Sequence, residues 1–474
     1  MLQSMSTFLF LTHIAVASVV TCHILLRKSN VRAAIGWIAV VWLTLVIGIL
    51  LYLLFGINRV SRRAARLSRV PKPPHGRPVV SVAPATPVHI RKLAAIGQQI
   101  TGMSLTAGNR IAVHHGGEKA YGAMIDAING ARHSIAMASY IFRYDAVGHR
   151  FVEALIAARD RGVAVRVLVD GIGGGYLRDP TFRALRNAGV SCERFLHSWM
   201  PWRMPMLNLR NHKKLLIIDG VTSFTGGLNI GDENCGPTTK HGRVDDVHVG
   251  ICGPVSRQLL ISFAQDWTFT TDENLEGERW WPDLSLHQTG FGASLARGIP
   301  SGPDADVYHI ETVLGAALVL AQHRVRIVTP YFLPDDQLQF AIEQACLRGV
   351  IVEIVIPEHS DHLFMDWAMR AQVRVFKEIA TTISLGAAPF SHAKLLTVDG
   401  IWSLVGSTNW DTRSLRLNFE FDLECYDSVV CGELDALIDA KIACSRTLTD
   451  HELEVVPVWQ RICHAAARLL LPYL

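Results

Sequence analysis

The chain has 474 residues, which is enough for two packed domains or for one large duplicated domain. Hydrophobic residues make up 49% of it and the mean hydropathy is +0.23, which is high for a soluble enzyme and indicates a membrane-embedded part. The net charge of +4 is weak evidence for nucleic-acid binding, which usually needs a clustered basic face, so no nucleic-acid partner is expected. The nine cysteines form no Cys-x-x-Cys pair and no zinc-site spacing, so we expect reduced thiols and no metal.

Two apolar runs follow each other at the N-terminus. Residues 8–26 carry no charged side chain, and residues 33–57 carry none either. Each run is long enough to cross about 30 Å of hydrocarbon as a helix. A cleaved signal peptide is the alternative for the first run, but residues 1–7 lack the Lys or Arg with which such a peptide begins. Residues 1–58 are therefore predicted to form a transmembrane hairpin.

Basic residues flank the second apolar run unequally. Arg27, Lys28 and Arg32 precede it, whereas Arg59, Arg62, Arg63, Arg66, Arg69 and Lys72 follow it. The denser cluster favours a cytoplasmic location for everything downstream, and it would also lie against anionic headgroups. Prolines between residues 71 and 78 then indicate a linker, which we place at 59–105. The expected location is the cell membrane (the inner membrane in a Gram-negative cell), with more than one pass and a cytoplasmic catalytic part.

The remainder of the chain contains an internal repeat. Residues 131–170 and 321–356 each contain an apolar strand, a pair of aromatic residues, a helix that ends at Arg-Gly, and a β-branched strand. Strand–helix–strand units with apolar strands predict an α/β fold with parallel or mixed sheets flanked by helices. We expect two lobes, residues 106–300 and 301–450, related by a pseudo-twofold axis. Two independent domains with separate sites are the alternative.

Each lobe contains one copy of a His-x-Lys-x-x-x-x-Asp motif followed by a Gly-x-x-Asn tail. The copies place these residues at His212, Lys214, Asp219 and Asn229, and at His392, Lys394, Asp399 and Asn409. The apolar residues of each motif predict a buried strand that ends at an Asp-Gly turn. Histidine and lysine two residues apart on a strand point to the same face. The aspartate, seven residues after the histidine, should face away and brace the turn or pair with a basic group.

A histidine, a lysine and an asparagine on one face suit a phosphate group. Lysine supplies charge, asparagine supplies an amide donor, and a neutral imidazole can attack phosphorus. A second histidine opposite the first could protonate the leaving alkoxide and then deprotonate the incoming hydroxyl. This scheme for a phosphodiester requires no metal and no other cofactor. It favours one shared site over two separate ones, because one motif copy lacks a second acid–base group.

The attacking imidazole also needs an acceptor that holds its other nitrogen. Asp246 in the first half and Glu420 in the second half are the candidates. For each of them, a solvated surface carboxylate is the alternative interpretation.

The doubled motif with its Gly-x-x-Asn tails resembles the phospholipase D superfamily. Residues 226–233, 405–411, 413–420 and 23–28 resemble bacterial cardiolipin synthases of the membrane-anchored, two-transmembrane type, and the resemblance covers nearly the whole chain. It implies duplicated phospholipase D-like lobes and transfer of a phosphatidyl group from one phosphatidylglycerol to another, giving cardiolipin and glycerol. It also implies His212 as the nucleophile. The chain departs from the family at residues 244–248, where a Trp-Arg pair that often precedes the acid is absent.

Two further segments could contact lipid. Residues 195–207 form an apolar, proline-interrupted loop, which could dip into the bilayer, line an acyl channel or simply cover the core. The tail at 451–474 places apolar residues at helical spacing, so it could lie in the membrane interface or pack on its own lobe.

Phosphatidyl transfer to make cardiolipin is the leading hypothesis, with phosphatidylglycerol and membrane lipids as partners. A membrane-bound hydrolase that releases phosphatidic acid is the main alternative, since it differs only in whether water or a lipid hydroxyl reaches the phosphohistidine. The hairpin and the modest charge argue against a nuclease. Two complete motif copies argue against a non-catalytic scaffold. The sequence makes no prediction of the oligomeric state.

Overall fold

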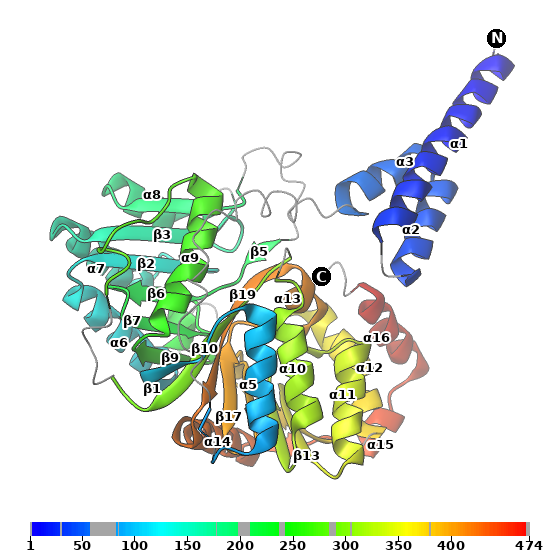
Figure 1. Ribbon diagram of the computed structural model, residues 1–474. Coiled ribbons are helices and arrows are strands. Elements are labelled where there is room, and N and C mark those ends of the chain that lie inside the picture. Colours follow the sequence, from blue (N-terminus) through cyan, green and yellow to red (C-terminus); the bar gives the residue numbers. More distant parts are fainter. Residues whose placement is uncertain are drawn as a thin grey trace. The chain divides into compact units, whose positions relative to one another are not determined.

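The computed structural model describes residues 2–28, 31–56, 82–83, 85–176, 178–197, 209–236, 242–283, 291–303, 306–378 and 381–470. The chain divides into two compact units, one formed by Met1–Arg63 and the other containing Ala64–Trp199 and Asn208–Leu474. Figure 1 shows the elements in chain order. The basic and proline-rich stretch at 59–78, and residues 198–207 of the predicted apolar loop, lie outside the described residues.

The N-terminal unit consists of helices α1 (Leu2–Arg27), α2 (Val31–Leu43) and α3 (Leu45–Leu51), with a final π-helical turn, η1 (Tyr52–Gly56). Small and aliphatic side chains from both predicted runs bury one another, among them Ala17, Ile24 and Val41. Polar side chains also pair across the two runs. His23 Nδ1 lies 2.8 Å from the hydroxyl of Tyr52, so these polar groups have a partner inside an otherwise apolar pair of segments.

One helix of this unit is long and apolar enough to cross a membrane, and its apolar window is Phe10–Arg27. The prediction of a second, uninterrupted span at 33–57 is not supported, because the helix in that run breaks at Thr44. The Thr44 hydroxyl donates to the carbonyl of Val40 at 2.7 Å, a local bond that bends helices. Within the second run, Ala33–Leu43 is an apolar helix that is shorter than a membrane span.

The second unit is built on one 16-stranded mixed sheet. Along the sheet, 15 strands lie in the order β20-β14-β13-β11-β16-β17-β19-β10-β1-β9-β7-β6-β2-β3-β4, and β5 pairs with β19 beside this path. The strands of the first half are β1 (Thr106–His115), β2 (Ser134–Ser139), β3 (Ala164–Asp170), β4 (Ser191–Phe195), β6 (Leu215–Ile218), β7 (Thr222–Gly226) and β9 (Val247–Cys252). Those of the second half are β10 (Ser294–Ser301), β11 (Arg324–Val328), β13 (Ile351–Pro357), β14 (Thr382–Gly386), β16 (Leu395–Val398), β17 (Trp402–Gly406), β19 (Asn418–Tyr426) and β20 (Ser445–Thr447).

The two halves of this sheet repeat the same order outward from its centre. β1 and β10 pair antiparallel, and from them the order runs β9, β7, β6, β2, β3, β4 on one side and β19, β17, β16, β11, β13, β14 on the other. In each half the strands near the centre are antiparallel. Three strands farther out are parallel and joined through helices: β2, β3 and β4 in the first half, and β11, β13 and β14 in the second. Antiparallel pairing of equivalent strands at the centre relates the lobes by a pseudo-twofold axis. The predicted α/β class and the duplicated lobes are therefore confirmed.

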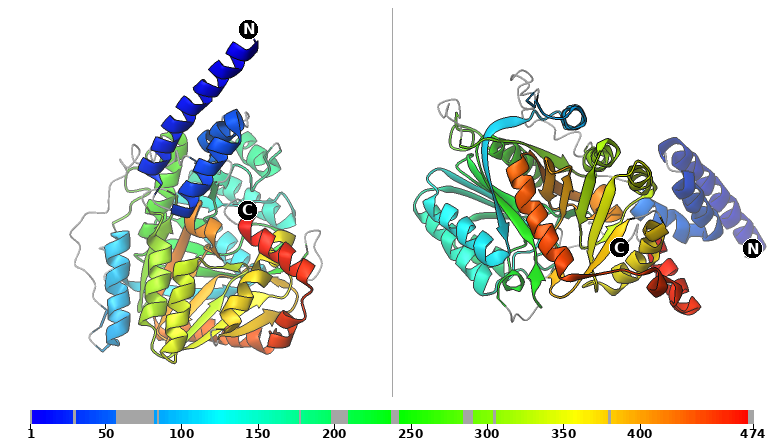
Figure 2. Two further views of the ribbon diagram at one scale, coloured as in Figure 1. Left: turned by 90° about the vertical axis from the view of Figure 1, so that its right-hand side faces the viewer. Right: turned by 90° about the horizontal axis from the view of Figure 1, so that it is seen from below.

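Helices cover both faces of the sheet (Figure 2). In the first lobe these are α6 (Gly117–Gly130), α7 (Ala146–Asp160), α8 (Pro180–Asn187) and α9 (Ser256–Thr271); in the second they are α10 (His309–Leu320), α11 (Asp336–Leu347), α12 (Leu363–Glu378) and α14 (Ser428–Ala443). The strands are therefore buried on both sides: every residue of β2 and of β19 is buried. This explains why β2 is a nearly continuous apolar run. β19, in contrast, alternates apolar residues with polar ones that are themselves buried, among them Glu420, Asp422 and Glu424.

Part of the predicted linker is structured. Residues within 59–105 form helix α5 (Val88–Thr101), whose Ile90, Leu93 and Ala94 belong to the core of the second lobe. Gly97 lets this helix approach closely, since a Cβ at that position would lie 2.0 Å from Nη2 of Arg297. The linker interpretation missed this helix because its apolar residues alternate with charged and polar ones.

A buried ion pair joins α5 to the centre of the sheet. Arg297 on β10 pairs with Glu424 on β19, and both side chains are fully buried. Arg297 also donates to the carbonyl of Ala94 at 3.0 Å, while Trp402 and Tyr426 donate to the second oxygen of Glu424 at 3.0 and 2.9 Å. Every charge in this network has partners, which is the condition under which buried ions are tolerated.

The predicted C-terminal tail contains the short helix α15 (Asp450–Glu454) and the longer α16 (Val458–Leu470). Helix α16 packs on α12 of the second lobe, where Ala467 joins a small cluster with Leu333, Ala368 and Met369. Of the two alternatives for this tail, packing on its own lobe is therefore observed. Val458, Trp459 and Ile462 on another part of the helix surface remain exposed.

The substitution Glu424→Gln should destabilise the protein strongly. It leaves the Arg297 guanidinium buried without a counter-charge, and breaking a buried pair in this way costs about 3–5 kcal/mol. Thermal unfolding of the full-length protein in detergent, followed by circular dichroism, measures the effect. The matched control is Glu193→Gln, which removes an ion pair with Arg186 whose two side chains are both exposed and which should cost less than about 1 kcal/mol. Equal melting temperatures for the two variants would contradict this description of the sheet centre.

Candidate active site

Two short strand pairs carry each motif histidine onto the opposite lobe. β5 (Arg210–Asn211) runs parallel to the first residues of β19, and β15 (Phe390–Ser391) runs parallel to β8 (Val244–Asp245). The amide of His212 donates to the carbonyl of Phe419 at 2.9 Å, and the amide of His392 donates to that of Asp245 at 2.7 Å. His212 therefore lies beside Glu420, the residue after Phe419, and His392 lies beside Asp246, the residue after Asp245. Both of these neighbours are acids.

The histidine–acid pairs are crossed between the lobes. Nδ1 of His212 lies 2.9 Å from Oε2 of Glu420, and Nδ1 of His392 lies 2.9 Å from Oδ2 of Asp246. Both acids are fully buried, which rules out a solvated surface position for either. The two imidazole rings face each other nearly edge to face, with their centroids 6.4 Å apart. The four residues thus form one site, and neither lobe supplies a complete histidine–acid pair alone.

The contacts of His212 define its tautomer. Nδ1 also lies 3.2 Å from the carbonyl oxygen of Ser407, which can only accept a hydrogen bond. The proton is therefore on Nδ1, and Nε2 keeps its lone pair. His392 differs, because its Nδ1 has both the Asp246 carboxylate and, at 2.9 Å, the Nζ of Lys394 as neighbours. The two histidines are similar in placement but not identical in environment.

Both motif lysines are buried beside the histidines. Lys214 donates to the carbonyl of His212 at 2.7 Å, and Lys394 donates to that of His392. Burial lowers the pKa of Lys214 to about 7 and that of Lys394 to about 8. Burial, followed by the positive charge of the two lysines, also lowers the pKa of His212 well below its usual value. His212 is consequently a neutral imidazole at neutral pH, the form that can act as a nucleophile.

The motif aspartates lie at the turns that follow the buried strands. Asp219 and Asp399 have φ angles of 51° and 54°, and each is followed by a glycine with positive φ. Asp219 accepts the amides of residues 132–134 at 2.7–2.9 Å, and Asp399 accepts those of residues 322–324 at 2.8–2.9 Å. Asp399 also pairs with His89 of α5 at 2.9 Å. Neither aspartate lines the cavity described next, and both tie the motif hairpin to the start of the neighbouring strand.

A cavity of about 790 Å³ opens over the paired histidines. His212, His392, Asn229 and Asn409 all line it, so the structure brings the asparagines of both tails to the same place. Lys214 and Lys394 are not among the lining residues, because their ammonium groups are directed to the histidine carbonyls. Asn409 is buried, and its Oδ1 has no partner among the described residues.

One glycine of the first tail is required by the crossed arrangement. A Cβ at Gly227 would lie 2.2 Å from Oδ1 of Asp246, closer than any side chain could approach. The absence of a side chain here lets the acid reach His392 through the gap.

The sequence interpretation missed several residues of the site. Tyr140 packs against His212 with ring centroids 4.9 Å apart, although the sequence identified it only as a marker of the repeat. Lys213 and Asn211 both bond the buried Asp266 of α9, at 2.9 and 3.0 Å, which fixes the segment around the first histidine. No short-range pattern connects Asp266 to this segment, since it lies 55 residues from Asn211.

Comparison with known proteins identifies the family of the chain. The family description "Cardiolipin synthase, PLD-like domain" matches residues 124–267 and 314–442, one segment in each lobe. The chain belongs to this family. It is therefore a phosphatidyltransferase of the phospholipase D superfamily, with phospholipids as substrates and an association with the membrane. The resemblance predicted from the doubled motif is confirmed.

Relatives with assigned names extend over most of the chain. The major cardiolipin synthase ClsA of Bacillus subtilis (strain 168) is 33% identical over 372 residues, which covers 78% of this chain and 76% of the relative. A cardiolipin synthase of Geobacillus kaustophilus (strain HTA426) is 30% identical over 96% of this chain and 92% of its own length. Among solved structures, a phosphatidylserine synthase of Haemophilus influenzae Rd KW20 has a TM-score of 0.61 at 15% identity, covering 81% of this chain and all of that one, and so shows a shared fold.

The activity of this family member should decline as the pH rises through about 7 and 8. The pKa values of Lys214 and Lys394 are about 7 and about 8, so both ammonium groups lose their protons in this range, and the site loses attraction for an anionic phospholipid. In Lys394→Arg the charge at that position persists to high pH, so the part of the decline near pH 8 should disappear, whereas the part near pH 7, which belongs to Lys214, should remain. The kcat/KM in mixed micelles, measured from about pH 5 to about pH 10, tests this, and a profile that stays flat to the upper limit would contradict it.

Loss of either buried acid should disable the whole site. We expect Glu420→Gln and Asp246→Asn each to lower kcat by about 100-fold or more, because each removes the charge that fixes one imidazole. The measurement is kcat at saturating phospholipid, with thermal unfolding to verify folding. Asp160→Asn, which removes an exposed carboxylate of the first lobe, is the control and should leave kcat unchanged. If only one of the two variants lowered kcat, catalysis would not require both crossed histidine–acid pairs.

Proposed function

We propose that the protein transfers a phosphatidyl group from one phosphatidylglycerol to a hydroxyl of a second, giving cardiolipin and glycerol. The observation that carries this proposal is the facing pair of histidines in one cavity, each bonded to a buried acid of the other lobe. Family membership and the names of the relatives support the same reaction.

The reaction follows from the roles that these residues can take. Nε2 of His212 attacks the phosphorus of the first lipid, and His392 gives its proton to the departing glycerol oxygen, so that a phosphatidyl-histidine forms. His392 then takes the proton from a hydroxyl of the second lipid, whose oxygen attacks the same phosphorus. The P–N bond breaks, cardiolipin is released and His212 is regenerated. Asn229 and Asn409 donate to the phosphate oxygens, while Lys214 and Lys394 stabilise their charge from behind the histidine carbonyls.

A second anionic lipid fits this cavity better than water does as the acceptor. Two arginines, Arg210 of β5 and Arg413 of α13 (Thr412–Arg416), come from different lobes and both line the cavity. Both interact electrostatically with the Tyr140 hydroxyl beside His212. Guanidinium groups beyond the histidine pair provide a place for the phosphate of the acceptor lipid. A hydrolase would have no use for a second phosphate site.

For the membrane topology we propose two passes and a cytoplasmic catalytic unit. The apolar window of α1 supports the first pass. The uncharged run at 33–57, helical in segments from Val31 to Gly56, supports the second. The basic residues between 59 and 72 favour the cytoplasmic side for the rest of the chain.

Phosphatidylglycerol labelled in its headgroup and its acyl chains tests the reaction. The purified protein in mixed micelles should release labelled glycerol and produce cardiolipin, whereas phosphatidic acid without cardiolipin would show a hydrolase. The variants His212→Ala and His392→Ala should each abolish both products. Near-normal turnover in either variant would exclude a shared site. Mapping the phosphorylated peptide of the trapped intermediate identifies the nucleophile, which we expect to be His212.

The arginine pair should control the choice between transfer and hydrolysis. The double variant Arg210→Gln/Arg413→Gln should raise the KM for phosphatidylglycerol by about tenfold and shift product from cardiolipin to phosphatidic acid, since the donor still reacts but the acceptor phosphate is held less well. The control Arg110→Gln/Arg132→Gln, which changes two exposed arginines, should leave the product ratio unchanged. An unchanged ratio in the first double variant would exclude the acceptor site.

A further inference from the structure

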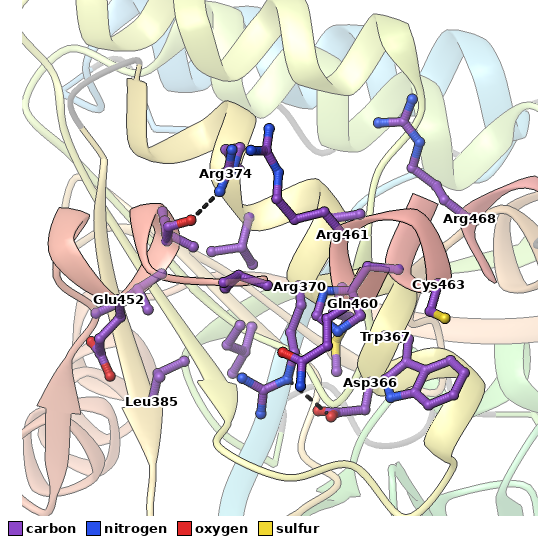
Figure 3. A pocket seen from close by; sticks show the side chains of 18 of the residues that line it. Asp366, Trp367, Arg370, Arg374, Leu385, Glu452, Gln460, Arg461, Cys463 and Arg468 are labelled. Atoms are coloured by element: carbon purple, nitrogen blue, oxygen red, sulfur yellow. Dashed lines mark hydrogen bonds and ion pairs between the residues drawn. The ribbon is translucent and has the colours of Figure 1, made fainter. Parts of the chain in front are cut away.

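A second cavity lies in the second lobe, away from the histidines. It has a volume of about 540 Å³ and is formed by α12, by the adjoining strands β13 and β14, and by the C-terminal helices α15 and α16 (Figure 3). None of its lining residues lines the catalytic cavity. It therefore has no part in the reaction described above.

The interior of this cavity is apolar. Met369 and Val373 of α12 and Leu385 of β14 contribute buried side chains, and Leu448 adds another from the segment before α15. Trp459 of α16 lines the cavity as well, although most of its side chain is exposed. The opening thus continues into the exposed apolar surface of α16.

Positive charge exceeds negative charge around the opening. Five arginines line the cavity, at 370, 374, 446, 461 and 468, against three carboxylates, Glu358, Asp366 and Glu452. The carboxylates are engaged by two of the arginines: Arg370 bonds Asp366 at 3.0 Å, and Arg446 bonds Glu358 at 2.7 Å and also Glu452.

The other three arginines have no carboxylate partner among the described residues. Arg374 donates to the carbonyl of Leu453, and Arg468 donates to the amide oxygen of Gln372 at 3.5 Å. Arg374, from α12, and Arg461, from α16, both line the cavity, and Figure 3 shows their guanidinium groups on the same side of it in this view. Cations that line one cavity favour the binding of an anion there, and guanidinium forks match the oxygens of a phosphate.

The surface beside this arginine pair is apolar and exposed. Val455, Val458, Trp459 and Ile462 are each more than 60% exposed; the last three lie on α16, the helix that carries Arg461, and Val455 lies just before it. A helix with an aromatic and aliphatic side next to arginines is typical of segments that lie in the membrane interface. Charge and apolar surface therefore point to the same kind of ligand.

We propose that this cavity binds the headgroup of one anionic phospholipid of the bilayer, with its phosphate between Arg374 and Arg461. The adjoining surface of α16 enters the interface beside it, so that Trp459 and Ile462 contact the acyl chains. The site holds the catalytic unit on a membrane that contains anionic lipid, by a contact separate from both the N-terminal helices and the catalytic cavity. The lipid bound here is not turned over.

Quenching of Trp459 fluorescence by brominated lipids tests this proposal. The full-length protein is used in nonionic detergent micelles, with His212→Ala in every variant so that the lipid is not consumed. Brominated-chain phosphatidylglycerol is titrated, and the difference between this parent and Trp459→Phe isolates one tryptophan out of 11. Half-maximal quenching should require about tenfold less phosphatidylglycerol than brominated phosphatidylcholine. Equal quenching by the two lipids would show that Trp459 merely lies in the micelle, and would overturn the site.

The arginines are tested by a matched pair of double variants. Arg374→Gln/Arg461→Gln should weaken the phosphatidylglycerol response about tenfold, to the level of phosphatidylcholine, whereas Arg110→Gln/Arg132→Gln should not change it. Unchanged quenching in the first variant would overturn the proposal. Inorganic phosphate in large excess should not displace the lipid. Displacement would show that the cavity serves a soluble phosphate and that the lipid assignment is wrong. None of these outcomes depends on the reaction at His212.

Discussion

The crossed bonds between His212 and Glu420 and between His392 and Asp246 are the constraint on which the site depends. Each bond requires the strand that precedes a histidine of one lobe to pair with the segment that precedes an acid of the other lobe. The short pairings of β5 with β19 and of β15 with β8 provide this placement, and the antiparallel pair of β1 and β10 holds the lobes in register behind them. Duplication of the lobe therefore did more than repeat a binding motif: it made each copy dependent on the other for the orientation of its imidazole.

The burial of these pairs explains their chemistry. A carboxylate that accepts from Nδ1 leaves Nε2 with its lone pair, and burial beside two lysines keeps His212 neutral at a pH where a free imidazole would be partly charged. The lysines are destabilised as cations by the same burial, and an incoming phosphate would restore their charge. The site therefore favours an anion, because a phosphate would place negative charge beside the two buried lysines.

Much of this arrangement could be predicted from the sequence. The repeat, the two motifs, the asparagine tails and the identity of both acids are local patterns, because strand and turn residues recur at fixed spacing. The crossing of the acids could not be predicted, because pairing between strands 208 and 146 residues apart depends on how the lobes meet. The roles of Arg297, Asp266 and Tyr140 were missed for the same reason: their partners are distant in sequence. The second apolar run was predicted as one helix, but the helix in this run is interrupted at Thr44.

The central claim is that two motif copies form one site, so that a single lipid phosphate can be held covalently at a time. The number of phosphatidyl groups trapped per chain measures this most directly. The wild-type protein is mixed with excess short-chain phosphatidylglycerol, quenched rapidly at alkaline pH to preserve phosphohistidine, and examined as an intact chain by mass spectrometry. We expect one phosphatidyl adduct per chain at saturation, carried by one histidine. Two adducts on the same chain would contradict the composite site and show that each lobe reacts independently.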